Sequence, residues 1–311
     1  MNSSGATPES VAEADLGALG AQLGSGGHTT LHELVHYAIA GWNGPLVYKK
    51  YRGPDEDPRR LEQIVQLRGQ LTPARRAALD QIAAWPRQVV HDRAGDVTGV
   101  VLPRIPDEYI ATIVSPTGRQ LVTPRELQYL LIDPSRSKRL GWPTPNPQER
   151  LFLCRDFAGA LSLLHDDLDV VFGDINHVNE LFRLRPETGV YLVDCDAVRP
   201  RGIETPHKQL NTPDWVPPEG GELCLATDRY KLALFVLRTL VPGAATQTDP
   251  ALAARALDGA GMVLLRQALA NDPAVRPTAA EWHRYFTTLL GGHEPPPPSP
   301  EDAFFRRPPI R

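Results

Sequence analysis

Residues 170–198 read VVFGDINHVNELFRLRPETGVYLVDCDAV and contain two short apolar runs that each lead into an aspartate. The first run delivers Asp174 to a turn, Asn179 follows five residues later, and the second run delivers Asp194. Carboxylate and amide oxygens at the ends of short strands suit Mg²⁺, which prefers hard oxygen ligands together with phosphate oxygens. One carboxylate remains to orient or deprotonate a hydroxyl group. The stretch therefore predicts a phosphate-handling site with a bound divalent cation.

The composition favours a globular protein that acts on neither nucleic acid nor membranes. The chain has 311 residues and a formal net charge of -4, which provides no long-range attraction for polyanions or anionic lipid. The cysteines are three in number and show no C-x-x-C spacing, so a disulfide framework or a cysteine zinc site is not expected. The apolar segment LALFVLRTLV is too short to cross a bilayer. We expect a soluble, cytoplasmic protein.

The order of the periodic segments predicts an α+β protein with a β-rich front and a mostly helical back. Residues 1–20 lack the pattern of a secretory signal and are predicted to be a disordered leader. Strands are expected around LVYKKYR and on both sides of Gly95, Asn43-Gly44 predicts a hairpin turn, and residues 58–85 predict two helices with Thr72 capping the second. Further helices are expected over residues 146–166, 226–240, 251–270 and 278–290, before a proline-rich disordered tail over 291–311.

Residues 24–36 read GSGGHTTLHELVH and support two incompatible interpretations. The glycines of the front half suggest a loop that covers phosphates between two strands, whereas His32-Glu33-Leu34-Val35-His36 matches the helical H-E-x-x-H pattern of zinc proteases. A zinc site needs a helix and a third ligand, and the nearby candidates Glu56 and Glu62 lie beside Pro54 and Pro58. We expect Leu31 to Tyr37 to form a strand and His32 and His36 to bind no metal.

The pattern Asp-x-x-x-x-Asn followed by Asp-x-Asp resembles the catalytic loop and metal-binding turn of protein kinases. GSGGHTTL is similar to the kinase glycine-rich loop, and LVYKKY to the strand that carries the nucleotide-binding lysine. NTPDWVPPE looks like the end of an activation segment, with Thr212 in the substrate-facing loop. TDRYKLALFVL and LANDPAVRPTAAEW resemble the central helix and the last recognisable segment of the family. These signals follow the family order over residues 23–290.

The resemblance implies a bilobal α+β fold, with a kinase N-lobe over 21–104, a C-lobe over 105–290, and ATP in the cleft. Asp174 would align the substrate hydroxyl, while Asn179 and Asp194 would hold Mg²⁺ (or Mn²⁺). Lys49 would contact the α- and β-phosphates and pair with a helix glutamate, for which Glu62 is the candidate. Nucleotide contacts are also implied for the glycine-rich loop, two apolar strand residues and the hinge: Gly24, Ser25, Gly26, Gly27, His28, Leu31, Val47, Leu102, Arg104 and Ile105.

The same resemblance implies structural roles for Asp228, which would hydrogen-bond the catalytic-loop backbone, and for an ion pair between Glu219 and Arg276. The chain departs from the family pattern at three positions. Gly173 replaces an arginine, so a phosphate on the activation segment would lack its cationic partner, and Asn176 replaces a lysine. Asp196 is an additional carboxylate after Asp194, with either a supporting role beside the metal ligand or a role in stiffening the turn.

These features predict a stand-alone, bacterial-type Ser/Thr protein kinase of the eukaryotic-like family, which transfers the γ-phosphoryl group of ATP to protein substrates. A cognate phosphatase is a possible partner, and the substrates are not identified by the sequence. The alternative is a pseudokinase, a nucleotide-binding scaffold or regulatory module, which the departures at Asn176 and Asp196 favour. A zinc metalloprotease is a distant third interpretation.

Overall fold

The computed structural model describes residues 9–53, 57–114, 118–142, 144–202, 211–243 and 246–291. They divide into two compact units, each described on its own. The first unit comprises Met1–Pro106, Leu163–Ile175 and Tyr191–Asp228, and the second comprises the remaining segments. The expected contiguous division after residue 104 assigns residues 163–175 and 191–228 to the C-lobe, whereas these segments pack with the first unit. The expected tail lies outside the described residues, apart from its first residue, Gly291.

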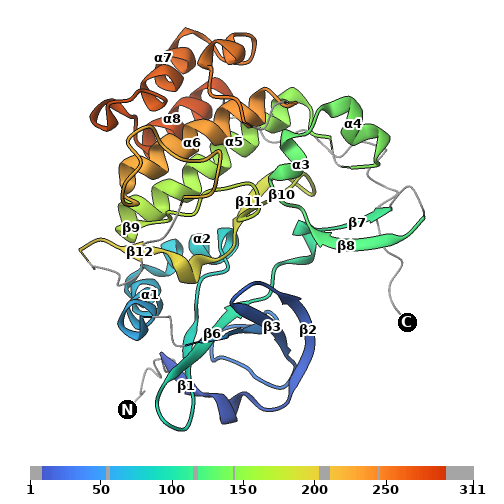
Figure 1. Cartoon of the computed structure of the whole chain (residues 1–311), viewed down its shortest axis with the longest axis vertical. Coiled ribbons are helices and arrows are strands. Elements are labelled where there is room, and N and C mark those ends of the chain that lie inside the picture. The colour runs from blue at the N-terminus through green and yellow to red at the C-terminus, as the bar shows by residue number, and fades with distance from the viewer. Residues whose placement is uncertain are drawn as a thin grey trace. The chain divides into compact units, whose positions relative to one another are not determined.

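The first unit is built on a six-stranded sheet in the order β1-β5-β6-β4-β3-β2 (Figure 1). All neighbouring strands are antiparallel except β1 and β5, which are parallel. The strands are β1 (Ser10–Ala12), β2 (Leu19–Ser25), β3 (Thr29–Leu34), β4 (Leu46–Tyr51), β5 (Gln88–His91) and β6 (Val97–Pro103). Together with the helices, this sheet confirms the predicted α+β class.

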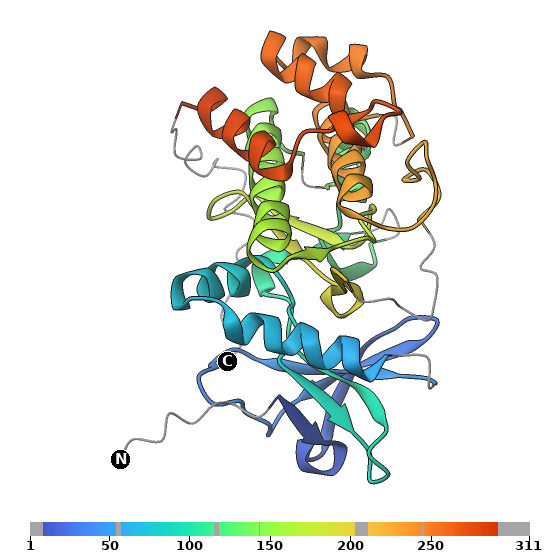
Figure 2. The ribbon, with the colours of Figure 1, turned by 90° about the vertical axis from the view of Figure 1, so that its left-hand side faces the viewer.

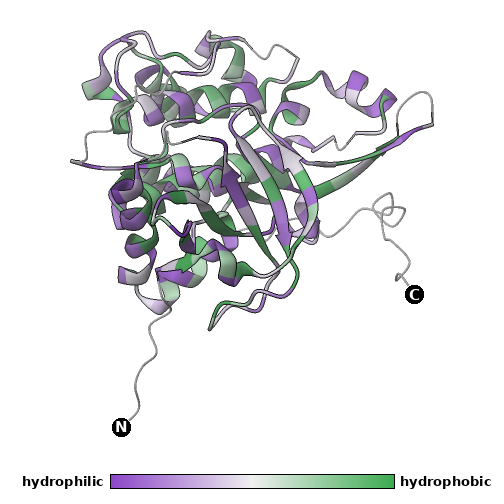
Figure 3. Cartoon of the chain, turned by 60° about the horizontal axis from the view of Figure 1, so that its bottom comes forward, coloured by the Kyte–Doolittle hydropathy of each residue, from purple (hydrophilic) through white to green (hydrophobic). Residues whose placement is uncertain are grey.

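Successive side chains of each strand point to opposite sides of the sheet, and apolar residues are buried on both sides. In Figure 3 hydrophobic and hydrophilic residues are interspersed along the elements of the chain. One face carries the buried residues Leu16, Leu34, Ile39, Leu46, Tyr48, Val90 and Val101. The other face and the helix against it bury Val47, Tyr51, Leu61, Val65, Val89, Val100 and Leu102. We call this second set, with the half-buried Leu31 and Val97 that pack on it, the inner cluster.

Two helices follow β4, and their starts are set by local sequence. Asp57 caps α1 (Pro58–Gln70) by accepting from the amide of Arg59, and Thr72 caps α2 (Pro73–Ile82) by accepting from the amide of Arg75. α1 lies against the sheet (Figure 2) and contributes Leu61 and Val65 to the inner cluster. The buried Trp85 indole then donates to the Ile64 carbonyl at 2.9 Å, which ties α1 to the segment after α2. Both predicted helices and the predicted Thr72 cap are confirmed.

The predicted disordered leader is wrong for residues 9–20. Ser10 to Ala12 form β1 and pair in register with Val89 to His91 of β5. In the following 3₁₀ turn, η1 (Glu13–Leu16), Leu16 is 1% exposed and belongs to the cluster on the sheet face opposite the inner cluster. A three-residue strand is too short to show a period in a polar sequence, so its pairing with β5 has no signal in residues 1–20.

Two local expectations between residues 31 and 45 are also wrong. β3 ends at Leu34, because the chain bends at Val35 and His36, and Val35 is 61% exposed. The connection to β4 turns at Ala40 and Gly41, where Gly41 adopts a φ of +76°, and not at Asn43-Gly44. The H-E-x-x-H residues therefore start in a strand and end in a bend, which contradicts the helix that a zinc-protease motif requires.

The later segments of the first unit contribute short elements on either side of Asp174 and Asp194. A π-helical turn, η3 (Leu163–Asp167), leads into β9 (Val170–Val171), which pairs with β12 (Arg199–Pro200). β11 (Gly189–Leu192) leads into a 3₁₀ turn, η4 (Cys195–Ala197). The carbonyl of Leu192 accepts from the amide of Ala84 at 2.9 Å, which fixes the end of β11 beside the segment after α2.

The second unit consists mainly of helices. Its helices are α3 (Gln128–Leu131), α4 (Pro134–Arg139), α5 (Pro147–Ser162), most of α6 (Leu225–Leu240), α7 (Gly259–Ala268) and α8 (Ala279–Leu289), with 3₁₀ turns η2 (Asp107–Tyr109), η5 (Pro250–Arg255) and η6 (Pro273–Val275). Two antiparallel pairs add β7 (Ile110–Val114) with β8 (Gln120–Pro124), and β10 (Glu180–Arg183) with β11. Phe157 of α5 stacks on Phe235 of α6 at 4.2 Å. In the described part of the chain, no helix has the length and hydropathy to cross a bilayer.

The predicted helices of the back portion are confirmed with one correction. The stretch over 251–270 contains two helical elements: η5 ends at Arg255, and Asp258 caps the start of α7 by accepting from the Gly261 amide. Thr278 and Glu281 form a reciprocal capping box at the start of α8. Such caps fix where a helix begins more sharply than apolar spacing does.

Gly99 allows β6 to approach β4 closely beside Lys49. A Cβ at Gly99 would lie 2.1 Å from the Lys49 carbonyl oxygen, so any side chain forces the two strands apart. We expect Gly99→Ala to lower the free energy of unfolding by roughly 2 kcal/mol or more. Gly69→Ala is the matched control, because Gly69 lies in α1 with open space around it. This substitution should stabilise the helix by about 0.5–1 kcal/mol. Denaturant unfolding of both variants checks this, and equal effects would contradict the close approach.

Candidate functional site

Lys49 lies on the inner face of the sheet, in the central strand β4. The register pairs it with Leu31 of β3 and Val100 of β6, and Val47 and Tyr51 share its face two residues away on either side. The lysine is 7% exposed, although buried lysines are rare unless their ammonium group has a partner. Its aliphatic stem is therefore enclosed, and the partners of its ammonium group decide what it can do.

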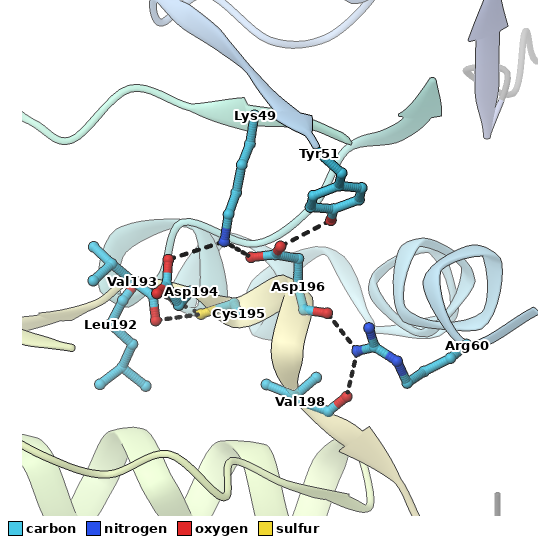
Figure 4. Close-up of polar contacts among 9 residues, drawn as sticks. All are labelled: Lys49, Tyr51, Arg60, Leu192, Val193, Asp194, Cys195, Asp196 and Val198. Carbon is cyan, nitrogen blue, oxygen red and sulfur yellow. Dashed lines mark hydrogen bonds and ion pairs between the residues drawn. The ribbon is translucent and has the colours of Figure 1, made fainter. Parts of the chain in front are cut away.

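The turn after β11 supplies those partners. The Lys49 Nζ atom lies 3.0 Å from Asp194 Oδ1 and 2.8 Å from Asp196 Oδ1 (Figure 4). Asp194 adopts a left-handed backbone conformation with φ +56°, and its carbonyl accepts from the Ala197 amide at 2.9 Å. This tight turn directs both carboxylates at the same ammonium group. The cluster contains one cation and two anions.

The two carboxylates differ in their environment. Asp196 is 3% exposed, and its second oxygen, Oδ2, accepts from the Tyr51 hydroxyl at 2.8 Å. The Asp194 side chain is 51% exposed. Asp196 is therefore enclosed by protein donors, whereas Asp194 presents oxygen to the surroundings. We call Lys49, Tyr51, Asp194 and Asp196 the lysine cluster.

The pKa values of the buried pair move in the directions expected for an ion pair. Burial alone would lower the pKa of Lys49, but the carboxylates of Asp196 and Asp194 outweigh it and raise that pKa above its ordinary value. Burial alone would raise the pKa of Asp196, but the Lys49 ammonium and the Tyr51 hydroxyl lower it below its ordinary value. Both groups are charged at neutral pH.

The expected pairing of Lys49 with Glu62 is wrong. Glu62 is exposed on α1, and the lysine pairs with the two aspartates of the turn. The inward-pointing charged residue of α1 is Arg60, which is 8% exposed. Its Nη1 donates to the carbonyls of Asp196 and Val198, the latter at 3.2 Å. α1 is therefore hydrogen-bonded to the main chain of the turn, and the turn itself provides the carboxylates that pair with Lys49.

Asp174 follows β9 on a segment that Asp228 anchors. The two carboxylate oxygens of Asp228 accept from the amides of Phe172 and Gly173 at 2.7 and 2.9 Å, and His165 Nε2 lies 3.0 Å from Asp228 Oδ2. The predicted hydrogen bonds between Asp228 and the backbone of this segment are confirmed. Asp228 is fully buried at the start of α6, so it fixes the backbone immediately before Asp174.

Thr212 orients the Asp174 side chain. The Thr212 hydroxyl donates to Asp174 Oδ1 at 3.0 Å, and the Thr212 carbonyl accepts from the Trp215 amide at 3.0 Å. Trp215 is buried, which holds the segment that carries Thr212 in place. The sequence places Thr212 in a substrate-facing loop, but its bond to Asp174 joins residues 38 positions apart and has no local signal.

The glycine-rich stretch forms the tip of the β2–β3 hairpin. Gly24 pairs with Leu31 at the end of β2, and the Gly26 amide donates to the Thr29 carbonyl at 2.9 Å to close the turn. The His28 carbonyl accepts from the Arg52 amide at 2.7 Å, and Arg52 Nη2 lies 3.4 Å from the Ser25 hydroxyl. Gly27 has open space around its Cα. That these amides cover phosphates stays a prediction.

The expected nucleotide-contacting apolar residues share the face of Lys49. Leu31, Val47 and Leu102 all belong to the inner cluster, and Val47 pairs directly with Leu102. At the expected hinge, the Arg104 amide donates to the Pro45 carbonyl at 3.0 Å, and Ile105 is half-buried. The structure thus groups three of these side chains with the lysine, and contact with a nucleotide base stays a prediction.

Asn179 belongs to the second unit, where Asn176 organises its turn. The Asn176 side-chain oxygen accepts from the amides of Val178 and Asn179 at 2.8 and 3.1 Å, and the Asn176 amide lies 3.3 Å from Glu180 Oε2. Asn179 is buried at 5% exposure. Asn176 therefore has a structural use that the sequence comparison with a kinase lysine does not suggest. Joint metal binding by Asn179 and Asp194 stays a prediction.

Two remaining site expectations have partial outcomes. Arg276 donates to the Ala270 carbonyl at 3.1 Å and its guanidinium lies 5.0 Å from the centre of the Tyr230 ring, while its pairing with Glu219 stays a prediction. Across the described ranges, no group of three or more His, Cys, Asp or Glu side chains is arranged to hold a metal ion on its own. A Mg²⁺ ion that relies on one or two carboxylates and on phosphate oxygens does not need such a group.

The lowered pKa of Asp196 predicts how pH affects the stability of the lysine cluster. A carboxylate with a depressed pKa contributes stability above its unfolded-state pKa of about 4 and loses it as pH falls through the folded-state value. We expect wild type to be more stable than Asp196→Asn by a constant amount from pH 8 to pH 5. The difference should shrink below about pH 4. Urea unfolding across this range checks the sign, and a difference that already declines above pH 5 would contradict it.

Comparisons with known proteins leave the family open. A scan against protein-family models finds no match, and a search of curated proteins finds no relative of this chain. The site geometry is therefore the basis for assigning a function.

Proposed function

We propose that this chain is an ATP-dependent protein kinase that transfers the γ-phosphoryl group of ATP to Ser or Thr hydroxyls of protein substrates. The proposal includes a bilobal kinase-like arrangement, with the six-stranded sheet as the core of the smaller lobe. The observation that carries it is the coexistence, in one unit, of a buried strand lysine paired with Asp194 and of an anchored Asp174 that accepts from Thr212.

Lys49 would stabilise negative charge on the α- and β-phosphates, because its ammonium group is charged and held at a fixed point. Asp174 would accept the proton of the attacking Ser or Thr hydroxyl as the new O–P bond forms. The bond between the γ-phosphorus and the β,γ-bridging oxygen breaks at the same time, and that oxygen leaves on ADP. Thr212 supports this role by fixing the orientation of the Asp174 carboxylate.

The residues fit a magnesium ion bound together with nucleotide phosphates. Asp194 offers a half-exposed carboxylate beside Lys49, and Asn179 is the second ligand that the kinase pattern implies. When bound, the ion would neutralise charge on the β- and γ-phosphates. The left-handed turn fixes the backbone of Asp194, so its carboxylate lies beside Lys49 before any ligand binds.

The rival function is a pseudokinase that binds nucleotide without useful transfer. Asn176 favours it, because its side chain caps a turn at the position where a kinase lysine would add positive charge near the transferred phosphate. The acid groups of the kinase pattern, Asp174 and Asp194, are nevertheless both present and held in place. We therefore prefer an active enzyme with a modest rate.

Incubation of the purified chain with radiolabelled ATP, Mg²⁺ and a generic protein acceptor tests the proposal. We expect label on Ser or Thr residues, and a loss of about 10²- to 10⁴-fold in rate for Asp174→Asn. Asp167→Asn is the matched control, because Asp167 is a nearby surface carboxylate that pairs with Arg75 at 3.2 Å. ATP binding with no transfer by the wild type would support the pseudokinase, and no ATP binding would contradict both functions.

Gly173 predicts that transfer does not depend on phosphorylation of the activation segment. A phosphate there needs a cationic partner, and the residue before Asp174 provides only a backbone amide, which Asp228 already engages. We expect phosphatase-treated enzyme to keep its initial rate within about twofold of untreated enzyme, a change below about 0.4 kcal/mol. Mass spectrometry of both samples verifies the phosphate content. A large loss of rate that returns on incubation with ATP would show that phosphorylation activates the chain.

A further inference from the structure

We propose that Asp196 is the positioning residue for Lys49 and replaces the helix glutamate that the kinase pattern places opposite the lysine. The inference deepens the proposed function and rests on it, because it treats Lys49 as the lysine that contacts nucleotide phosphates. The turn that provides the proposed metal ligand Asp194 would then also provide the carboxylate that fixes the position of the Lys49 ammonium group.

The contacts assign Asp196 to this role more directly than any other acid. Its Oδ1 lies 2.8 Å from Lys49 Nζ and its Oδ2 accepts from the Tyr51 hydroxyl, so both oxygens are used inside the protein (Figure 4). Tyr51 and Lys49 stand two residues apart on β4 and face the same side of the sheet. The strand therefore supplies both groups that hold the Asp196 carboxylate.

The charges of the cluster leave Asp194 available for a second role. Asp196 alone balances the Lys49 charge in the buried part of the cluster, whereas the half-exposed Asp194 can turn toward a cation without leaving the ammonium group unpaired. With Asp194 as the sole partner, metal binding would compete with the lysine for one carboxylate. A second, buried carboxylate separates the two tasks.

α1 contacts the turn through a cation, Arg60, whereas the kinase pattern has a glutamate on this helix. Arg60 donates to the main-chain carbonyls of Asp196 and Val198 and leaves the Asp196 carboxylate to face the lysine (Figure 4). Glu62, two residues along the helix, is exposed. α1 therefore stabilises the turn, and Lys49 is held without an acid from the helix. Removing Glu62 should have no effect on nucleotide binding.

The test compares Asp196→Asn with Glu62→Gln in the full chain. Asn keeps the shape of the side chain but removes its charge, which weakens the hydrogen bond with the Lys49 ammonium group. We expect Asp196→Asn to raise the KM for ATP, and the Kd for a fluorescent ATP analogue, by about 10- to 100-fold. Glu62→Gln should change neither by more than about twofold, which is below 0.5 kcal/mol.

A double-variant comparison separates positioning from a purely structural role. With Lys49→Met in place, adding Asp196→Asn should change nucleotide affinity by less than about twofold, because Asp196 acts through the lysine. The double variant should also unfold at a higher temperature than Lys49→Met alone, because it no longer buries an unpaired carboxylate. Equal additional loss of affinity in both backgrounds would overturn the inference.

Tyr51→Phe keeps the inference testable if Asp196→Asn does not fold. It removes only the donor to Asp196 Oδ2, so we expect a rise of about 3- to 10-fold in the KM for ATP with the fold intact. If the wild type binds and turns over ATP and the variants Asp196→Asn and Tyr51→Phe have the same KM for ATP as the wild type, the inference is overturned but the proposed function is not. Wild type that binds no ATP would overturn the proposed function as well.

Discussion

The ion pair between Lys49 and Asp196 is the interaction on which the arrangement of the first unit depends. It joins the central strand of the sheet to the turn after β11, across 147 residues of sequence, in an environment from which water is excluded. A buried pair of this kind contributes specificity only if its hydrogen bonds are satisfied, and Tyr51 completes them. The position of the half-exposed Asp194 follows from it, because Asp194 and Asp196 belong to the same turn.

Two further anchors set the remaining functional groups. Asp228 holds the backbone before Asp174, and Thr212 fixes the Asp174 side chain, so the proposed base is oriented from both directions. Arg60 joins α1 to the main chain of the turn. α1 and the lysine cluster are therefore connected through this turn. The site is prearranged, which is the condition for electrostatic stabilisation of a transferred phosphoryl group.

The sequence predicts well those features that a few neighbouring residues determine. β4, α1, α2 and the Thr72 cap follow from period and capping residues, and the apolar runs before Asp174 and Asp194 place both acids after strands. The choice of partners is a different problem. Arg60 lies four residues before Ile64 and Glu62 three before Val65, so helical spacing puts both at the edge of the buried face. Only the packing of α1 selects Arg60. The pairing of β1 with β5 likewise depends on tertiary packing and cannot be predicted from the local sequence.

The most direct test of this account is a crystal structure of the chain with Mg²⁺ and a non-hydrolysable ATP analogue. The account predicts that Lys49 Nζ keeps its contact with Asp196 and lies about 3 Å from an α- or β-phosphate oxygen. Asp194 should be coordinated to the metal at about 2.1 Å. A structure in which Lys49 pairs with Glu62, or in which Asp196 leaves the lysine to bind the metal, would contradict it.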